Sequence, residues 1–236
     1  MSGLTGETIA WFLDPANWSG INGIPNRMWE HIQMSVLALV IASLIAIPAA
    51  VYLAHRRMGG SFVVAAVNIG RSIPSLAVVA VALPITIRMG LGFGFWPTIL
   101  ALLFLAIPPL FSNAHAGVSG VDTAVVDAAN GMGMKDFQVM VRIELPLAMP
   151  VLIAGARIAA VQVVATATLG ALVAWGGLGR YIIDGFATRD TAEVVGGGIL
   201  VALLALVTEL GFTIAERVSQ RKARVHGDID TLLGVE

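Results

Sequence analysis

The chain has 236 residues, of which 57% are hydrophobic and only 12% are charged, and its formal net charge at pH 7 is -1. Soluble domains carry about 25% charged residues, so this composition favours a protein of the lipid bilayer. The charge balance offers no basic stripe for nucleic acid, which excludes that partner. The absence of cysteine excludes disulfides, cysteine metal sites and a cysteine nucleophile.

The N-terminal segment, residues 1–30, lacks a basic start, an apolar run and a small-residue cleavage site, so it shows no signal peptide. It mixes aromatic residues with Pro, Gly and polar residues. Indole rings partition well at the membrane surface, and we expect an extracytoplasmic, interfacial segment. The aromatic residues concerned are Trp11, Phe12, Trp18 and Trp29. A partly ordered tail is the alternative.

Five stretches are apolar enough to cross a hydrocarbon core of ~30 Å, which takes about 20 residues. They cover residues 32–54, 62–87, 96–116, 147–174 and 194–215. The fold class we expect is therefore all-α and integral to the membrane, with a transmembrane domain over 31–216. Residues 217–236 have the composition of a solvated cytoplasmic tail.

The distribution of Lys and Arg predicts the orientation, because cytoplasmic loops are enriched in these residues. With the N-terminus outside, the cytoplasmic segments hold Arg56, Arg57, Lys135, Arg142, Arg217, Arg221, Lys222 and Arg224. The outer segments then hold Arg27, Arg88, Arg180 and Arg189. Eight basic residues on the cytoplasmic side against four on the outer side favour an N-terminus outside the cytoplasm and a C-terminus inside it (N-out, C-in).

Small residues are abundant in the fourth and fifth predicted spans, as in residues 165–179 and 194–207. Such residues allow helices to approach closely in lipid, where the hydrophobic effect does not drive their association. A bundle of five helices of this kind is small for a complete transporter. We therefore expect one half of a larger assembly.

The polar stretch at 118–146 interrupts these apolar surroundings. Val121, Val125 and Ala128 share one face of a predicted helix, and Asp122 is placed to cap its start. Gly131 and Gly133 break that helix. Asp136 is placed to cap a second helix, which Leu145-Pro146 closes. We expect two short helices that project from the membrane with apolar residues at the tip.

A projecting tip of this kind fits a groove on a partner protein, and an amphipathic loop lying flat on the bilayer is the alternative. Its residues also carry a resemblance to a known family. Asp127-Ala128-Ala129, then Gly133, then Ile143-x-Leu145-Pro146 resembles the signature loop of ABC importer permeases, with Asp127 where the family usually has Glu. The resemblance implies a type I, MetI-like permease of the cell membrane.

The resemblance extends over about residues 30–215 and is greatest to the osmoprotectant branch, which carries glycine betaine, choline and carnitine. It implies that a coupling helix sits in a cleft of a separate ATPase. The coupling residues are Asp127, Ala128, Ala129, Gly131, Gly133, Met134 and Lys135. It also implies two ATPase subunits, a second permease, identical or related, and an extracytoplasmic substrate-binding protein. Amino-acid importers share this plan, so an amino acid or another small solute is the alternative substrate.

Catalytic motifs are absent from the sequence. ATP hydrolysis needs a P-loop with a Gly-Lys pair, and neither Lys135 nor Lys222 follows a glycine. We expect a non-catalytic subunit without its own cofactor, whose partner binds ATP and Mg²⁺. The four histidines form no ligand cluster, so we expect no metal and a structural or interfacial role for each.

Charged and helix-breaking residues within the spans mark a candidate pathway. Arg71 and Arg157 either extend to the inner interface or line the pathway. Pro74 is expected to break the second span, and freed backbone groups are tolerated only beside protein or a water-filled cavity. The candidate pathway residues are Ser72, Pro74, Ser75 and the aromatic residue Trp175. A purely structural kink at Pro74 is the alternative.

The stretch 175–190 falls on the outer side in this orientation, and its 180–186 part favours a short helix. Docking of a substrate-binding protein is one role, and an ordinary connecting loop is the other. Two further classes compete with an ABC permease. A secondary transporter would show internal repeats, and a structural membrane subunit would need neither a proline-broken span nor an intramembrane arginine.

Overall fold

The structure, a computed structural model, describes residues 2–58 and 60–232. Its helices are α1 (Ser2–Leu13), α2 (Ile24–His55), α3 (Gly60–Ile69), α4 (Ser75–Arg88), α5 (Phe95–Ser119), α6 (Thr123–Gly131), α7 (Asp136–Val139), α8 (Leu145–Thr166), α9 (Gly179–Thr188) and α10 (Thr191–Leu232). Short 3₁₀ segments lie at Pro15–Trp18, Gly70–Ser72 and Ala167–Val173. A π-helical turn, Met140–Glu144, joins α7 to α8.

Four helices are long and apolar enough to cross a membrane: Ile24–His55, Phe95–Ser119, the continuous stretch Asp136–Val173, and Thr191–Val218. The predicted span 62–87 is instead two shorter helices, α3 and α4. Proline disfavours the helical region for the residue before it, and Ile73 is extended, with φ -81 and ψ 123. The predicted break at Pro74 is confirmed, whereas the number of crossings and their orientation stay predictions.

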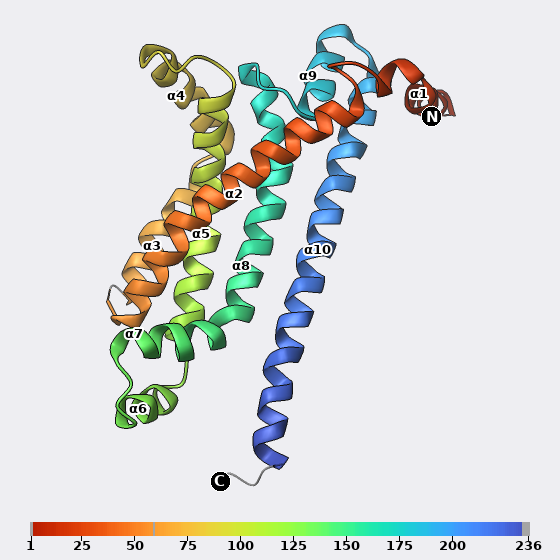
Figure 1. Cartoon of the computed structure of the whole chain (residues 1–236). Coiled ribbons are helices and arrows are strands. Elements are labelled where there is room, and N and C mark those ends of the chain that lie inside the picture. The colour runs from red at the N-terminus through yellow and green to blue at the C-terminus, as the bar shows by residue number, and fades with distance from the viewer. Residues whose placement is uncertain (1, 59, 233–236) are drawn as a thin grey trace.

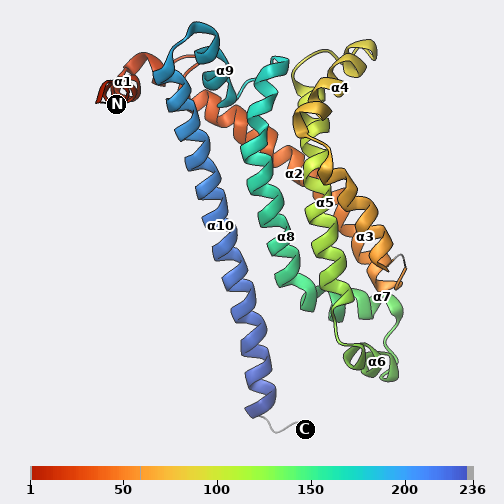
Figure 2. The ribbon, with the colours of Figure 1, turned by 180° about the vertical axis from the view of Figure 1, so that it is seen from behind.

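The long helices form a bundle with two different ends (Figures 1 and 2). α2 crosses the bundle at a tilt, and α5, α8 and α10 run alongside one another. α6, α7 and the end of α10 lie at one end, whereas α1, α9 and the far end of α4 lie at the other. In Figure 1 the α7 segment runs across the end of the bundle and then turns into α8.

The core lies between α2, α5 and α8. Every fourth residue of α2 from Ala38 to Ala54 is a buried alanine. This stripe shares one apolar cluster with Leu102 and Leu110 of α5 and Leu152 of α8. Small side chains let helix backbones approach closely, which is how helices associate where lipid removes the hydrophobic driving force.

Both terminal segments are more helical than expected. α1 packs against α10, and the rings of Trp11 and Tyr181 meet edge to face with centroids 5.3 Å apart. α2 already begins at Ile24, inside the predicted segment 1–30, because Pro25 suits a first helical turn. α10 continues to Leu232 into the predicted tail, whose residues 233–236 lie outside the described residues.

Candidate functional site

Residues 122–139, here called the knob, form two short helices at one end of the bundle (Figure 1). The carboxylate of Asp122 accepts a hydrogen bond from the Ala124 amide at 2.9 Å, so the predicted cap is confirmed. α6 ends at Gly131, and Gly133 has φ +83, a conformation that favours glycine. The two helices that the sequence predicts on either side of a glycine turn are therefore present.

The start of α7 differs from the prediction. Lys135 is the residue before the helix, and the Gln138 side chain accepts the Lys135 amide hydrogen at 2.9 Å. The prediction that Asp136 caps this helix was therefore wrong. Asp136 is the first helical residue, and its carboxylate pairs with Arg56 of α2 at 3.2 Å. The expected end of the helix at Leu145-Pro146 was also wrong, because the chain stays helical into α8.

The tip of the knob carries exposed apolar side chains. Met132 is 77% exposed, Phe137 69% and Val125 42%. Ala129 and Val139 are buried, so each short helix has one covered face. Large exposed apolar side chains such as Met132 and Phe137, here called the tip of the knob, are typical of a surface that a partner protein covers.

The predicted coupling residues occupy the second half of α6 and the turn after it. They are Asp127, Ala128, Ala129, Gly131, Gly133, Met134 and Lys135. Ala129 is buried and Met134 is half-buried, whereas the others are exposed. The structure thus brings them together on one small projection.

The base of the knob is attached to α2 by ionisable side chains. His55 Nδ1 lies 2.6 Å from Glu144 Oε2, and these side chains are only 10% and 8% exposed. His55 Nε2 lies 3.8 Å from Asp136 Oδ1. The exposed Arg56–Asp136 pair completes the contact. One imidazole therefore stands between a carboxylate of the π turn and a carboxylate of α7.

The candidate pathway residues do not converge. Ser72 and Pro74 are exposed at the break between α3 and α4. Ser75 lines a small pocket with Ile73 and residues of α5, and Trp175 is not among its lining residues. The break and the tryptophan are therefore separate features of the surface that the structure describes.

Trp175 follows the 3₁₀ segment at the end of α8. Its ring meets Phe95 with centroids 5.7 Å apart. Its Nε1 is buried and has no hydrogen-bond partner among the described residues. A buried indole N–H normally has a hydrogen-bond partner. The Trp175 N–H can therefore donate to a bound molecule or to a group that a conformational change brings to it.

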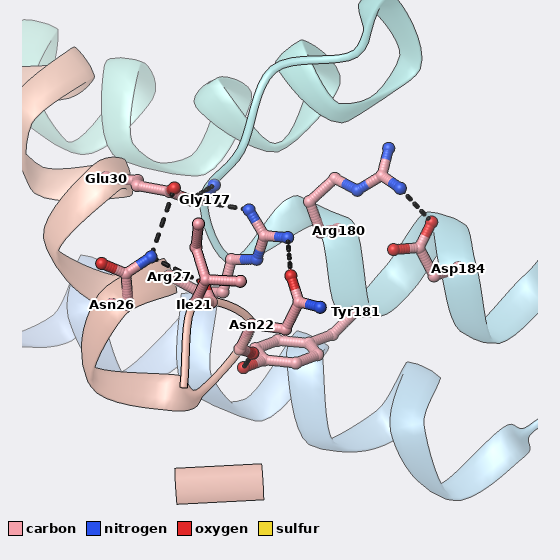
Figure 3. A network of polar contacts seen from close by, with 9 residues as sticks. All are labelled: Ile21, Asn22, Asn26, Arg27, Glu30, Gly177, Arg180, Tyr181 and Asp184. Atoms are coloured by element: carbon pink, nitrogen blue, oxygen red, sulfur yellow. Dashed lines mark hydrogen bonds and ion pairs between the residues drawn. The ribbon is translucent and has the colours of Figure 1, made fainter. Parts of the chain in front are cut away.

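A polar network holds the loop that carries Trp175 and Gly177, here called the Trp175 loop, against the start of α2 (Figure 3). This network lies at the end of the bundle opposite the knob (Figure 1). The Glu30 carboxylate accepts from the Gly177 amide at 2.8 Å and from Arg27 at 2.9 Å. Asn26 donates to it at 3.3 Å. A Cβ on Gly176 would collide with the same carboxylate. The consecutive glycines therefore let the loop approach Glu30.

Tyr181 of α9 completes this network. Its hydroxyl donates to the Asn22 carbonyl oxygen at 2.6 Å (Figure 3). Burial raises the pKa of Tyr181 to about 12; Arg27 acts in the opposite direction, and Glu193 and Glu30 add to the rise. The hydroxyl stays protonated as a donor well above neutral pH. The predicted short helix in 180–186 is confirmed as part of α9.

Arg157 connects α8 to α10. Its guanidinium lies 3.1 Å from Glu209 and 3.6 Å from Glu216, and it donates to Thr213 at 3.4 Å. The sequence alone predicts that Arg157 extends to the inner interface or lines the pathway, and does not predict these acidic partners on α10. The side chain of Arg71 lies outside the described part of the chain.

The described residues, 2–58 and 60–232, contain no group of three His, Cys, Asp or Glu side chains arranged to hold a metal. His31 is buried and donates from Nε2 to the Val164 carbonyl at 2.8 Å, so it has a structural role. His55 has the role at the knob described above. The His31–Val164 and His55–Glu144 contacts join residues far apart in the sequence, which is why local spacing did not predict them.

A bundle of apolar helices with a small projecting pair of helices at one end is the arrangement expected of a membrane permease subunit. The chain belongs to the family of inner membrane components of binding-protein-dependent transport systems, whose profile matches residues 41–225. The protein is therefore a multi-pass permease subunit of the inner membrane. This confirms the resemblance that the 125–146 motif carried.

Relatives with assigned functions match most of the chain. The choline transport system permease protein OpuBB of Bacillus subtilis (strain 168) is 34% identical, over 81% of this chain and 86% of its own. The carnitine transport permease protein OpuCB of Listeria monocytogenes is 36% identical, over 78% and 82%. The glycine betaine/carnitine/choline permease protein OpuCB of B. subtilis is 32% identical, over 80% and 84%.

Solved structures support the fold. The inward-facing MetNI methionine ABC transporter matches with a TM-score of 0.71 at 23% identity, over 81% of this chain and 93% of that chain. An amino acid ABC transporter crystallised with histidines matches with a TM-score of 0.63 at 16% identity, over 84% and 93%. These likenesses confirm the all-α, MetI-like permease fold.

Proposed function

We propose that this chain is the permease subunit of an ATP-driven importer for osmoprotectants: glycine betaine, choline, carnitine or related quaternary amines. The observation that carries the proposal is the 32% identity or more to permeases of these solutes over about four fifths of the chain. The chain forms half of the pathway and pairs with a second permease, identical or related. A substrate-binding protein delivers the solute from outside.

The knob couples the permease to its energy source in this proposal. Two ATPase subunits each hold one knob, with Met132 and Phe137 entering a cleft of the ATPase. The exposed tip supports this assignment, because a small rigid element with two large apolar side chains suits groove binding. Residues 127–135 make the contact, and the ATPase binds ATP and Mg²⁺, since this chain carries no P-loop.

The pathway assignment rests on the break at Pro74. Ser72, Pro74 and Ser75 supply backbone and hydroxyl groups beside α5, and Trp175 lies with Phe95 at the end opposite the knob. A methylated cation binds the face of an aromatic ring. The proposal therefore gives Trp175 and Phe95 a weak contact with the solute as it enters.

The substrate is tested by uptake of radiolabelled glycine betaine, choline and carnitine into cells that express the complete transporter. We expect uptake of at least one quaternary amine at high osmolarity, and none in cells without the permease. Uptake of an amino acid such as methionine, with no quaternary amine carried, would contradict the substrate assignment while leaving the permease class intact.

The knob is tested by the substitution Met132→Asp. A charge placed in an apolar cleft has to be desolvated, so we expect the ATPase to be lost from the purified complex, with normal membrane insertion of the permease. Ile21→Asp is the matched control, because Ile21 is equally exposed, at 77%, but lies at the opposite end. Retention of the ATPase by Met132→Asp would remove the coupling assignment.

A further inference from the structure

We propose that His55, Arg56, Asp136 and Glu144 are positioning residues that make α2 move with the knob. The closure of the ATPases would then act on α2 as well as on α5 and α8, the two helices that the chain joins directly to the knob. This inference rests on the proposed function, because it takes the knob to be the element that the ATPase holds. It adds to that function a mechanical route through the permease.

Three connections leave the knob, and they differ in kind. Two are covalent, because α5 leads into α6 and α7 continues through the π turn into α8. The third is made by side chains and reaches α2, whose residue His55 contacts Glu144 across 89 positions of sequence. Without this third connection, a displacement of the knob would reach α2 only through packing.

The side-chain connection is built to resist sliding. His55 and Glu144 are both about nine-tenths buried and lie 2.6 Å apart. A charge-assisted hydrogen bond is strengthened where water is excluded. Arg56 holds Asp136 at 3.2 Å from the exposed side. Two attachment points, one on the π turn and one on α7, fix the orientation of the knob as well as its distance from α2.

α2 itself reaches the other end of the molecule. It runs for 32 residues from Ile24 to His55, which is about 48 Å at 1.5 Å per residue. Its first turns hold Glu30, which accepts the Gly177 amide of the Trp175 loop. One helix therefore contacts the knob through His55 and the Trp175 loop through Glu30. A rigid helix with a fixed partner at each end can carry a displacement between them.

The absence of cysteine from the chain allows a direct test by cross-linking. The double variant Arg56→Cys/Asp136→Cys removes the exposed pair, and a bis-methanethiosulfonate linker replaces it with a tether that a reductant cleaves. The complete transporter is reconstituted in liposomes with its ATPase and binding protein. The readout is the ratio of glycine betaine transported to ATP hydrolysed.

We expect the ratio to fall by about fivefold or more before cross-linking, the lower range of a typical coupling between sites. Cross-linking should restore the ratio, and reductant should lower it again. An unchanged ratio in the uncross-linked variant would overturn the proposal. So would a tether that stops transport, because the knob would then have to separate from α2, and so would a fall that the tether does not reverse.

A matched control pair lies at the opposite end. Arg180→Cys/Asp184→Cys removes an ion pair of 2.7 Å within α9 that does not involve α2. The same linker should leave the ratio unchanged there. The buried pair is tested separately by Glu144→Gln, which keeps an acceptor for His55, against Glu144→Ala, which does not. We expect the Ala variant to lower the ratio more than the Gln variant, and equal ratios would remove Glu144 from the set.

Retention of the ATPase separates the two proposals. The positioning variants leave the tip unchanged, so they should keep the ATPase in the purified complex. Their ratio of glycine betaine transported to ATP hydrolysed should fall. Met132→Asp should lose the ATPase itself. If Met132→Asp keeps the ATPase, the coupling assignment of the knob fails whatever the ratio shows. If it loses the ATPase but the Arg56/Asp136 variant transports normally, only the positioning role fails.

Discussion

A single carboxylate organises the end of the molecule opposite the knob. Glu30 accepts hydrogen bonds from a side chain of its own helix, Arg27, and from a backbone amide, Gly177, that is remote in sequence (Figure 3). Burying a carboxylate is costly unless donors satisfy it. The loop and the helix start are therefore fixed as one unit, with the indole of Trp175 carried on that unit.

The titration of Tyr181 tests this arrangement. The pKa of Tyr181 is raised from 10.0 to about 12, chiefly by burial. In the variant Tyr52→Phe, which leaves Tyr181 as the remaining tyrosine, ultraviolet absorbance should report tyrosinate formation near pH 12. A midpoint near 10.0 would show that Tyr181 is solvated and that its bond to Asn22 is not maintained.

The sign of the pH effect follows from the raised pKa. Between pH 10 and about 12 the unfolded chain has already lost a proton that the folded chain keeps. Stability therefore falls as pH rises in that window. The contribution of Tyr181 is complete below pH 10 and is lost as the pH passes the folded pKa.

At this scale the sequence predicts those features that depend on neighbouring residues. Asp122 and Gly133 were predicted because a cap and a positive φ are local requirements. The cap of α7 was assigned to Asp136, because its carboxylate lies within one turn of the helix start. The side chain of Gln138, which lies in the same turn, accepts the Lys135 amide hydrogen instead, and Asp136 pairs with Arg56 of the distant helix α2.

Proline separates two helices at one place in the bundle and lies within a continuous helix at others. Pro48, Pro108 and Pro150 lie inside the continuous helices α2, α5 and α8. Pro74 instead separates α3 from α4. Neighbouring helices can satisfy the backbone groups that a proline frees within a membrane. Which proline breaks a span is therefore decided by packing, and the sequence alone predicted it for Pro74 without distinguishing the others.

Two ion pairs of nearly equal exposure, one inside the apolar spans and one outside them, allow the effect of the membrane on an ion pair to be measured. Arg157 and Glu209 are 29% and 42% exposed, and Arg180 and Asp184 are 31% and 40% exposed. The first pair joins α8 to α10 within two stretches that are long and apolar enough to cross a membrane. The second lies outside the spans in α9. Loss of a partner should therefore cost more in the first pair.

We expect Arg157→Ala to lower the free energy of unfolding by about 1–3 kcal/mol, because it removes the cation that pairs with the Glu209 carboxylate of α10. Arg180→Ala should change it by less than about 0.5 kcal/mol, as for an exposed helical pair. Thermal unfolding of the purified protein in lipid nanodiscs measures both. Equal losses would show that water reaches Arg157 as freely as it reaches Arg180.

At the scale of the whole molecule, four of the five predicted spans and the knob were predictable from the sequence. The second predicted span, which is two shorter helices, and the contacts between remote segments were not. Runs of apolar residues predict the long helices, and the motif at 127–146 predicts the knob. The pairs His55–Glu144, Glu30–Gly177 and Arg157–Glu209 join helices remote in sequence. Their partners are chosen by the packing of the bundle, so no local pattern predicts them.

The orientation of the bundle is tested by labelling. Single cysteines are introduced at the two equally exposed positions used above, Met132 and Ile21. The N-out orientation predicts that a membrane-impermeant thiol reagent labels Ile21→Cys in intact cells, and that Met132→Cys reacts only after the membrane is opened. The reverse pattern would invert the orientation and place the knob away from the cytosolic ATPase.

The π turn at Met140–Glu144 fits one residue more into a single turn than an α-helix does. Deleting one residue there would let the turn close into regular α-geometry with the helix faces on either side kept in register, so the knob would point in nearly the same direction. Deleting one residue from the regular part of α8 would instead rotate the knob by about 100° about the helix axis. The π turn is therefore a position where the chain can shorten by a residue without turning the surface that faces the partner.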